Sequence, residues 1–153
     1  MPETTGTDKL SQLGIMIILL GGVITMIGFF PGVIGAESAG GIGVLQTLAI
    51  LSGFAILIGG AFVFLRSSYY PSSKHTLAQR IAARLSMTGI VFSTASGLAD
   101  VLGFGSHPPI PPIQRPMLGS TQMVGLFLGF AIASAGVVIY ALMGDHHPSE
   151  PEI

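Results

Sequence analysis

The sequence predicts an all-α integral membrane fold of four transmembrane helices, built as a tandem duplication of a two-helix hairpin. Half of its 153 residues are apolar, only 8% are charged, and the mean hydropathy is +0.76. Long windows of the chain contain no Asp, Glu, Lys or Arg, and the similar heptapeptides KLSQLGI and RLSMTGI begin 75 positions apart. A soluble domain carries about 25% charged residues, so lipid is the solvent that suits this chain.

The first apolar stretch predicts a helix near 10–30, inside the charge-free window between Lys9 and Glu37. A spanning helix needs roughly 20 apolar residues, which this window provides. The preceding segment, 1–9, holds two acidic residues against one lysine, which is the wrong balance for a cleaved signal peptide. We therefore expect a retained helix after a short cytoplasmic segment.

The second charge-free window predicts a helix near 42–65, which completes a first hairpin over 10–65. The polar stretch that follows, 66–79, predicts a cytoplasmic linker. It contains the sequence RSSYYPSSKH, whose two tyrosines can lie at the headgroup level.

Two further apolar stretches predict helices near 80–102 and 120–143, which form a second hairpin over 80–143. The last of them lies in the longest charge-free window of the chain, between Arg115 and Asp145. The final segment, 144–153, is short and acidic, and we expect it to be a disordered cytoplasmic tail.

The basic residues predict the orientation. Four spans place both termini and the central linker on one side, and five of the six Lys and Arg residues fall there, against Arg115 alone on the other. The positive-inside rule then predicts an inner or cytoplasmic cell membrane with both termini in the cytoplasm. Anionic lipid headgroups are the expected partners of the linker and third-helix cations, Arg66, Lys74, Arg80 and Arg84.

The internal repeat covers both hairpins. At an offset of 75, a charged start and a GI pair recur, so that Gly14 matches Gly89 and Thr25 matches Asp100. At an offset of 76, Gln46 matches Gln122 and the sequence GFAI recurs at 53 and 129. Two spans per unit would keep both copies in one orientation, related by an axis along the membrane normal.

Small residues on the second and fourth predicted helices indicate close helix packing. Membrane helices associate through close backbone approach, which small side chains permit. The set of predicted packing residues is Ala49, Gly53, Gly60, Gly125, Gly129 and Gly136. We expect the second and fourth helices to pack against each other through these faces; the alternative is that the faces bind another subunit.

Four polar residues are expected on the outer face: Glu37, Asp100, His107 and Arg115. Asp100 is predicted to lie near the outer end of the third span, about 24 Å along a helix from Arg84. It is interpreted either as a structural ion-pair partner of Arg115 or as a carboxylate that couples proton or cation movement.

Several functions are disfavoured by composition. The chain has no cysteine, a net charge of −1 and no histidine inside a predicted span. These features argue against thiol chemistry, nucleic-acid binding and haem binding, so we expect no cofactor, no metal site and no catalytic residue. An enzyme acting on a lipid or quinone at the outer interface, through His107, is the third choice.

Two functions are left open by the sequence. The first is a non-catalytic subunit that packs against and stabilises a larger membrane complex, such as a respiratory or photosynthetic electron-transfer complex. A proline-rich outer loop, GSHPPIPPIQRPMLG, fits either docking to a neighbour or a stiff spacer. The alternative is a small oligomeric transporter or channel that uses Asp100 for coupling.

Overall fold

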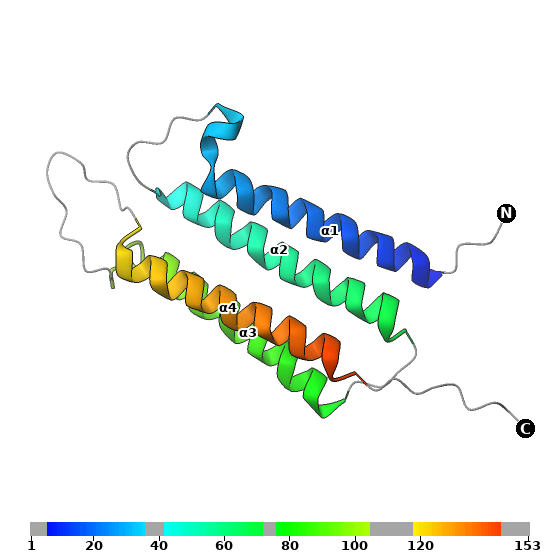
Figure 1. The fold of residues 1–153 in the computed structure, drawn as a ribbon. Coiled ribbons are helices and arrows are strands. Elements are labelled where there is room, and N and C mark those ends of the chain that lie inside the picture. Colours follow the sequence, from blue (N-terminus) through cyan, green and yellow to red (C-terminus); the bar gives the residue numbers. More distant parts are fainter. Residues whose placement is uncertain (1–5, 36–41, 72–75, 105–117, 145–153) are drawn as a thin grey trace, which may run out of the picture.

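The computed structural model describes residues 6–35, 42–71, 76–104 and 118–144, and these contain four α-helices and no β-strand. Three of the helices are long and apolar enough to cross a membrane, which indicates a membrane protein and confirms the all-helical prediction at that level (Figure 1). The helices are α1 (Gly6–Phe29), α2 (Val44–Tyr69), α3 (Leu77–Gly97) and α4 (Ser120–Leu142), with a short 3-10 helix, η1 (Pro31–Ile34), after α1. The three helices that are long and apolar enough to cross a membrane are α1, α2 and α4.

Three of the helices begin with the same local device, a glutamine at the third helical position. The Oε1 atom of Gln46 accepts a hydrogen bond from the Gly43 N–H at 2.9 Å, and Gln122 does the same for Gly119 at 2.9 Å. In α3, Gln79 accepts from the Thr76 N–H, and the Thr76 hydroxyl accepts from the Gln79 N–H. These bonds satisfy amides that a helix start leaves without a partner inside the helix.

Seven of the eight helix ends differ from the predicted ones, by one to five residues. The second helix continues to Tyr69, where Tyr70 and Pro71 stop it, because proline restricts the residue before it to non-helical angles. The third helix begins at Leu77 and ends at Gly97, five residues before the predicted end at 102. Glycine is a weak helix former, and the chain after it turns through Leu98–Gly103, where Gly103 has a φ of 83°.

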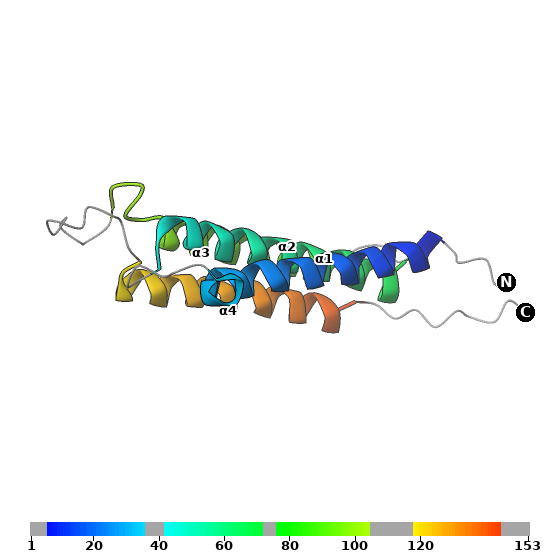
Figure 2. The ribbon, with the colours of Figure 1, turned by 90° about the horizontal axis from the view of Figure 1, so that it is seen from above.

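The helices form two antiparallel hairpins, α1 with α2 and α3 with α4 (Figure 1). In Figure 1, α2 lies between α1 and the second hairpin, and it contacts both α3 and α4. The end of α1 also reaches α4, where Phe29 stacks on Phe127. Figure 2 shows the same four helices from above. The start of α1, the end of α2, the start of α3 and the end of α4 lie at one end of the molecule. That end is hereafter the linker end, and the opposite one is the pocket end.

Glycines on α2 hold the first hairpin together. A Cβ atom on Gly53 would lie 2.5 Å from the backbone nitrogen of Thr25, and one on Gly60 would lie 2.7 Å from the backbone nitrogen of Ile18. Real Cβ atoms do not approach that closely, so the backbones of α1 and α2 can be this near only because these positions are glycine.

Glycines on α4 do the same in the second hairpin. A Cβ on Gly129 would lie 2.7 Å from the backbone nitrogen of Ser93, and one on Gly136 would lie 2.8 Å from that of Ser86. The two serines add hydrogen bonds across the helices, from Ser86 Oγ to the Ala133 carbonyl at 2.8 Å and from Ser93 Oγ to the Leu126 carbonyl at 3.0 Å.

The expected glycine contact between the second and fourth helices is therefore wrong. The close glycine contacts lie inside each hairpin, and Gly125 likewise faces α3, where its Cβ would lie 2.8 Å from the Cβ of Ser96. Ala49 is half-buried on α2. The glycine pattern was interpreted correctly as a packing signal but assigned to the wrong neighbour, because periodicity shows that a face is small without showing which helix covers it.

The second and fourth helices meet instead through large side chains. The rings of Phe54 and Phe130 are stacked with centroids 3.8 Å apart, and Ile50 and Leu126 share one buried cluster. Near the start of both helices, the Leu118 N–H donates to the Ile42 carbonyl at 3.0 Å. In each of these three pairs the partners are 76 positions apart, which is the offset between the two GFAI sequences.

The contacts of the first and third helices follow a different offset from the predicted one. Gly53 contacts Thr25 and Gly21, and Gly129 contacts Ser93 and Gly89, which relates α1 to α3 by 68 positions rather than 75. The two positive-φ glycines agree, since Gly35 has φ 73° and Gly103 has φ 83°, again 68 positions apart. The KLSQLGI and RLSMTGI heptapeptides thus lie two helical turns out of step in the structure.

Candidate functional site: a polar pocket beside Asp100

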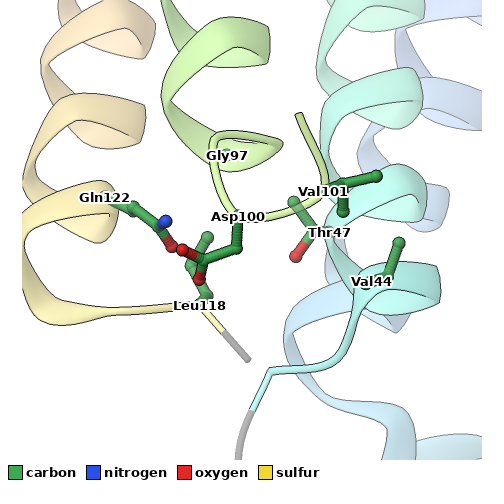
Figure 3. Close-up of a pocket in the computed structure, with 7 residues that line it drawn as sticks. All are labelled: Val44, Thr47, Gly97, Asp100, Val101, Leu118 and Gln122. Atoms are coloured by element: carbon green, nitrogen blue, oxygen red, sulfur yellow. The ribbon is translucent and has the colours of Figure 1, made fainter. Parts of the chain in front are cut away.

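A small pocket lies at the end of the bundle opposite the linker end, between the start of α2, the end of α3 and the start of α4 (Figure 3). Its polar walls are Thr47 from α2, Asp100 from the turn after α3, and Gln122 from α4. Val44 and Leu118 supply apolar walls. Its volume is about 10 Å³, which is room for about one water molecule.

Asp100 does not lie in the expected local structure. It lies at the pocket end, three residues beyond the end of α3, so it belongs to a turn rather than to a helical span. At the offset of 68, its counterpart in the first hairpin is Gly32 and not Thr25. Thr25 instead lies within α1, where its hydroxyl donates to the Gly21 carbonyl at 2.8 Å.

The two hairpins differ at one position that lines the pocket. Phe29 at the end of α1 stacks on Phe127 of α4 with ring centroids 5.8 Å apart. Its counterpart 68 positions later is Gly97, which has no side chain and lines the pocket next to Thr47 and Leu51. A Cβ on Gly97 would lie 3.1 Å from Thr47 Cγ2, so any larger side chain there would enter the space.

Gln122 is the most constrained polar group of the pocket. Its side chain is 8% exposed, and its Oε1 is engaged by the Gly119 N–H. That bond fixes which end of the amide is Nε2, and this donor is buried with no hydrogen-bond partner in the described part of the chain. Figure 3 shows the side-chain amide of Gln122 and the carboxylate of Asp100 in the lining of the same pocket.

Thr47 is 2% exposed, and its hydroxyl donates to the Gly43 carbonyl at 3.1 Å. The bond leaves the hydroxyl oxygen with acceptor capacity and directs the methyl group towards Gly97. Thr47 therefore helps to shape the wall while its own donor is satisfied within α2.

The predicted outer-face cluster is described only in part. Glu37, His107 and Arg115 lie outside the described residues, so Asp100 is the one member whose surroundings are known. Sequence reasoning did not include Thr47 and Gln122 in the site. The sequence singles out Gln122 only as the match of Gln46 in the repeat. Its position three residues after Gly119, at a helix start, is the signal that places its amide at the end of the bundle.

A second buried polar cluster lies at the linker end. Tyr70 and Tyr140 are 2% and 4% exposed, their rings meet edge to face, and the Tyr70 hydroxyl donates to the Ala141 carbonyl at 2.6 Å. Gln79, 1% exposed, has a buried Nε2 with no partner within the described ranges. The Thr76 hydroxyl donates to the Met143 carbonyl. The hydrogen bonds of Tyr70 and Thr76 join the end of α2 and the start of α3 to the end of α4.

The described residues hold no group of three or more His, Cys, Asp or Glu side chains that could bind a metal ion. Comparison with known proteins finds no matching family model, no matching curated protein and no matching solved structure. The argument for function therefore depends on the geometry of this chain alone.

Proposed function

We propose that this protein is a non-catalytic, multi-pass membrane subunit that packs against and stabilises a larger membrane complex. The observation that carries the proposal is the distribution of side-chain size. Small residues fill the two hairpin seams, whereas large apolar side chains on α1, α3 and α4, such as Met16, Val91 and Val124, point outwards and are 67–68% exposed. A surface of this kind suits lipid and neighbouring helices.

We take α3 to be the fourth span. It is less apolar than the others because it carries Arg80 and Arg84 as well as the polar residues Gln79, Ser86 and Ser93. The two arginines are exposed near the linker end, whereas the three polar residues are buried within the protein. Ser86 and Ser93 donate hydrogen bonds to carbonyl groups of α4, and Gln79 Oε1 accepts one from the Thr76 N–H at the start of α3. These polar groups are therefore not presented to lipid. Antiparallel packing along α4 supports the same depth for both helices.

The tandem duplication is retained with a corrected register. When a twofold axis parallel to the helices relates two copies, a residue near that axis contacts the equivalent residue of the other copy. Ile42 with Leu118, and Phe54 with Phe130, fit that rule at an offset of 76. The glycine contacts inside the hairpins fit it at offsets of 76 and 68.

Orientation and partners complete the proposal. We place the linker end in the cytoplasm, because Lys9, Arg66, Arg80 and Arg84 all lie towards that end, with anionic headgroups beside the last three and beside Lys74, which is outside the described residues. The complex is proposed to be an energy-transducing one, such as a respiratory or photosynthetic electron-transfer complex. The proline-rich segment is the proposed docking element for its neighbour.

Native purification tests the subunit proposal. The tagged chain is extracted in a mild detergent, separated under native conditions, and its companions are identified by mass spectrometry. We expect co-migration with larger membrane subunits. Migration of the chain alone at 15.8 kDa, or as a simple homo-oligomer, would contradict the proposal.

Cysteine labelling tests the fourth span, because the native chain has no cysteine. Single variants Ser68→Cys at the linker end and Leu102→Cys after α3 replace exposed residues. An impermeant maleimide should label the two from opposite faces of sealed cells or vesicles. Labelling of both from one face would mean that α3 does not cross the membrane.

The pocket favours one alternative, a small transporter or channel that uses Asp100 to couple proton or cation movement. Asp100 lines a polar opening at the pocket end, where a solute could enter from the outer side. Flux into proteoliposomes should then fall strongly in Asp100→Asn, whereas Asp8→Asn, which changes an exposed residue of the first turn of α1, should leave it unchanged. Equal flux in both variants would exclude this use of Asp100.

A further inference from the structure

We propose that the pocket beside Asp100 is a binding site for a single water molecule, held between the Nε2 of Gln122 and the carboxylate of Asp100. Both side chains line the pocket (Figure 3), and the Nε2 of Gln122 is buried without a hydrogen-bond partner among the described residues. The proposal is independent of whether the chain is a subunit or a transporter.

The size of the pocket sets the first limit on its occupant. A water molecule needs about 10–15 Å³ measured in this way, and the pocket provides about 10 Å³. A quinone head, an amino acid or a hydrated metal ion is several times larger. The occupant is thus of water size.

The polarity of the walls sets the second limit. Gln122 Nε2 is a buried donor that needs an acceptor, and its direction is fixed because Oε1 already accepts from Gly119. Asp100 offers a carboxylate that needs a donor. Water supplies both functions at once, accepting from the amide and donating to the carboxylate.

Ions fit these walls less well. A bare cation would be attracted by Asp100 but would face the positive end of the Gln122 amide dipole, which leaves that donor without an acceptor. An anion would satisfy the amide but would be repelled by the carboxylate. A donor and an acceptor side by side select a neutral molecule with both capacities.

The residues that line the cavity differ from their counterparts in the first hairpin. At the offset of 68, the first hairpin has Phe29, stacked on Phe127, in place of Gly97, and Gly32 in place of Asp100. Loss of the ring at Gly97 and presence of a carboxylate at Asp100 occur together in the second hairpin. An apolar void would stay dry, whereas a void with these two groups retains water.

Water contacts of side-chain amides, measured by NMR on the ¹⁵N-labelled full chain in lipid nanodiscs, test the proposal. The Gln122 amide should give a cross-relaxation signal with the sign of a long-lived bound water. Gln46 is the matched control, because it makes the same hydrogen bond to a helix start but has no buried, unpartnered nitrogen, so it should give a surface-water signal. Absence of the bound-water signal at Gln122 would overturn the proposal.

Two variants assign the site. Gly97→Ala should abolish the bound-water signal by filling the pocket, with only side-chain atoms in its way, and Asp100→Leu should abolish it by removing the acceptor. Persistence of the signal in either variant would show that the water lies elsewhere. A saturable shift of the Gln122 amide on adding NaCl, KCl or MgCl₂ would instead identify an ion site and contradict the proposal.

Discussion

Within each hairpin the backbones of the two helices are in close contact, but the side chains at that contact differ between the hairpins. The glycines of α2 and α4 are common to both, at Gly53 with Gly129 and at Gly60 with Gly136. The opposing helices differ: α3 carries serines that bond to α4, whereas α1 has Ile18 and Thr25 in those places. The difference indicates that glycine sets the distance between the helices, while hydroxyl groups add to the stability of one seam.

The largest expected effect is therefore the loss of a shared glycine. In Gly53→Ala the new methyl group meets the backbone of α1, which cannot move aside, so we expect a loss of about 1–3 kcal/mol in unfolding free energy. Gly129→Ala should cost a similar amount in the second hairpin. Unfolding titrations in mixed detergent micelles measure both.

Gly59→Ala is the matched control for this prediction. Gly59 lies on the same helix, and a Cβ there meets nothing within 4 Å. Alanine is the better helix former by about 1 kcal/mol, so this variant should be neutral or slightly more stable. Equal losses at positions 53 and 59 would contradict the seam described here.

A smaller effect is expected where the hairpins meet. Phe54→Leu removes the ring stacked on Phe130 and should cost about 0.5–1.5 kcal/mol beyond the lost area. Phe130→Leu should cost at least as much, because that ring also meets Phe127 edge to face. Phe104→Leu, at a ring that is 84% exposed, is the control, and a loss there equal to the other two would refute the assignment.

The smallest effect separates the two hairpins most directly. Ser86→Ala and Ser93→Ala each remove one hydrogen bond to α4 without changing the backbone, and each should cost about 0.6 kcal/mol. Thr25→Val in the first hairpin should be nearly neutral, since that hydroxyl bonds only to its own helix. The same titrations decide the comparison, with Ser52→Ala, an exposed serine that also bonds within its helix, as the control.

Much of the fold was predictable, because charge-free windows of about 20 residues leave few alternatives to helices. The end of α3 was not, since Val101 and Leu102 extend the apolar stretch although the helix stops at Gly97. The register of the repeat also failed. Glycine occurs on several faces of each helix, and Gly59, which contacts nothing, resembles Gly60, which lies in the seam, until the packing is known.

The site was predictable only through Asp100. A carboxylate at the end of an apolar stretch is conspicuous, whereas Gln122 and Thr47 are ordinary residues of an N-terminal helical turn. Their importance depends on Gly97, which stands where the other hairpin has a phenylalanine, and that equivalence emerges only at the offset of 68. The offset of 75 pairs Gly97 with Gly22, another glycine, so it does not reveal the missing ring.

Under the duplication proposed above, the stack of Phe54 on Phe130 has a consequence for the origin of this protein. A lone hairpin that presented such a ring to its own twin would have assembled as a symmetric homodimer, and every change in it would have been made twice. Joining the two copies in one polypeptide would remove that restriction, so that the second hairpin could carry Gly97 and Asp100 where the first carries Phe29 and Gly32.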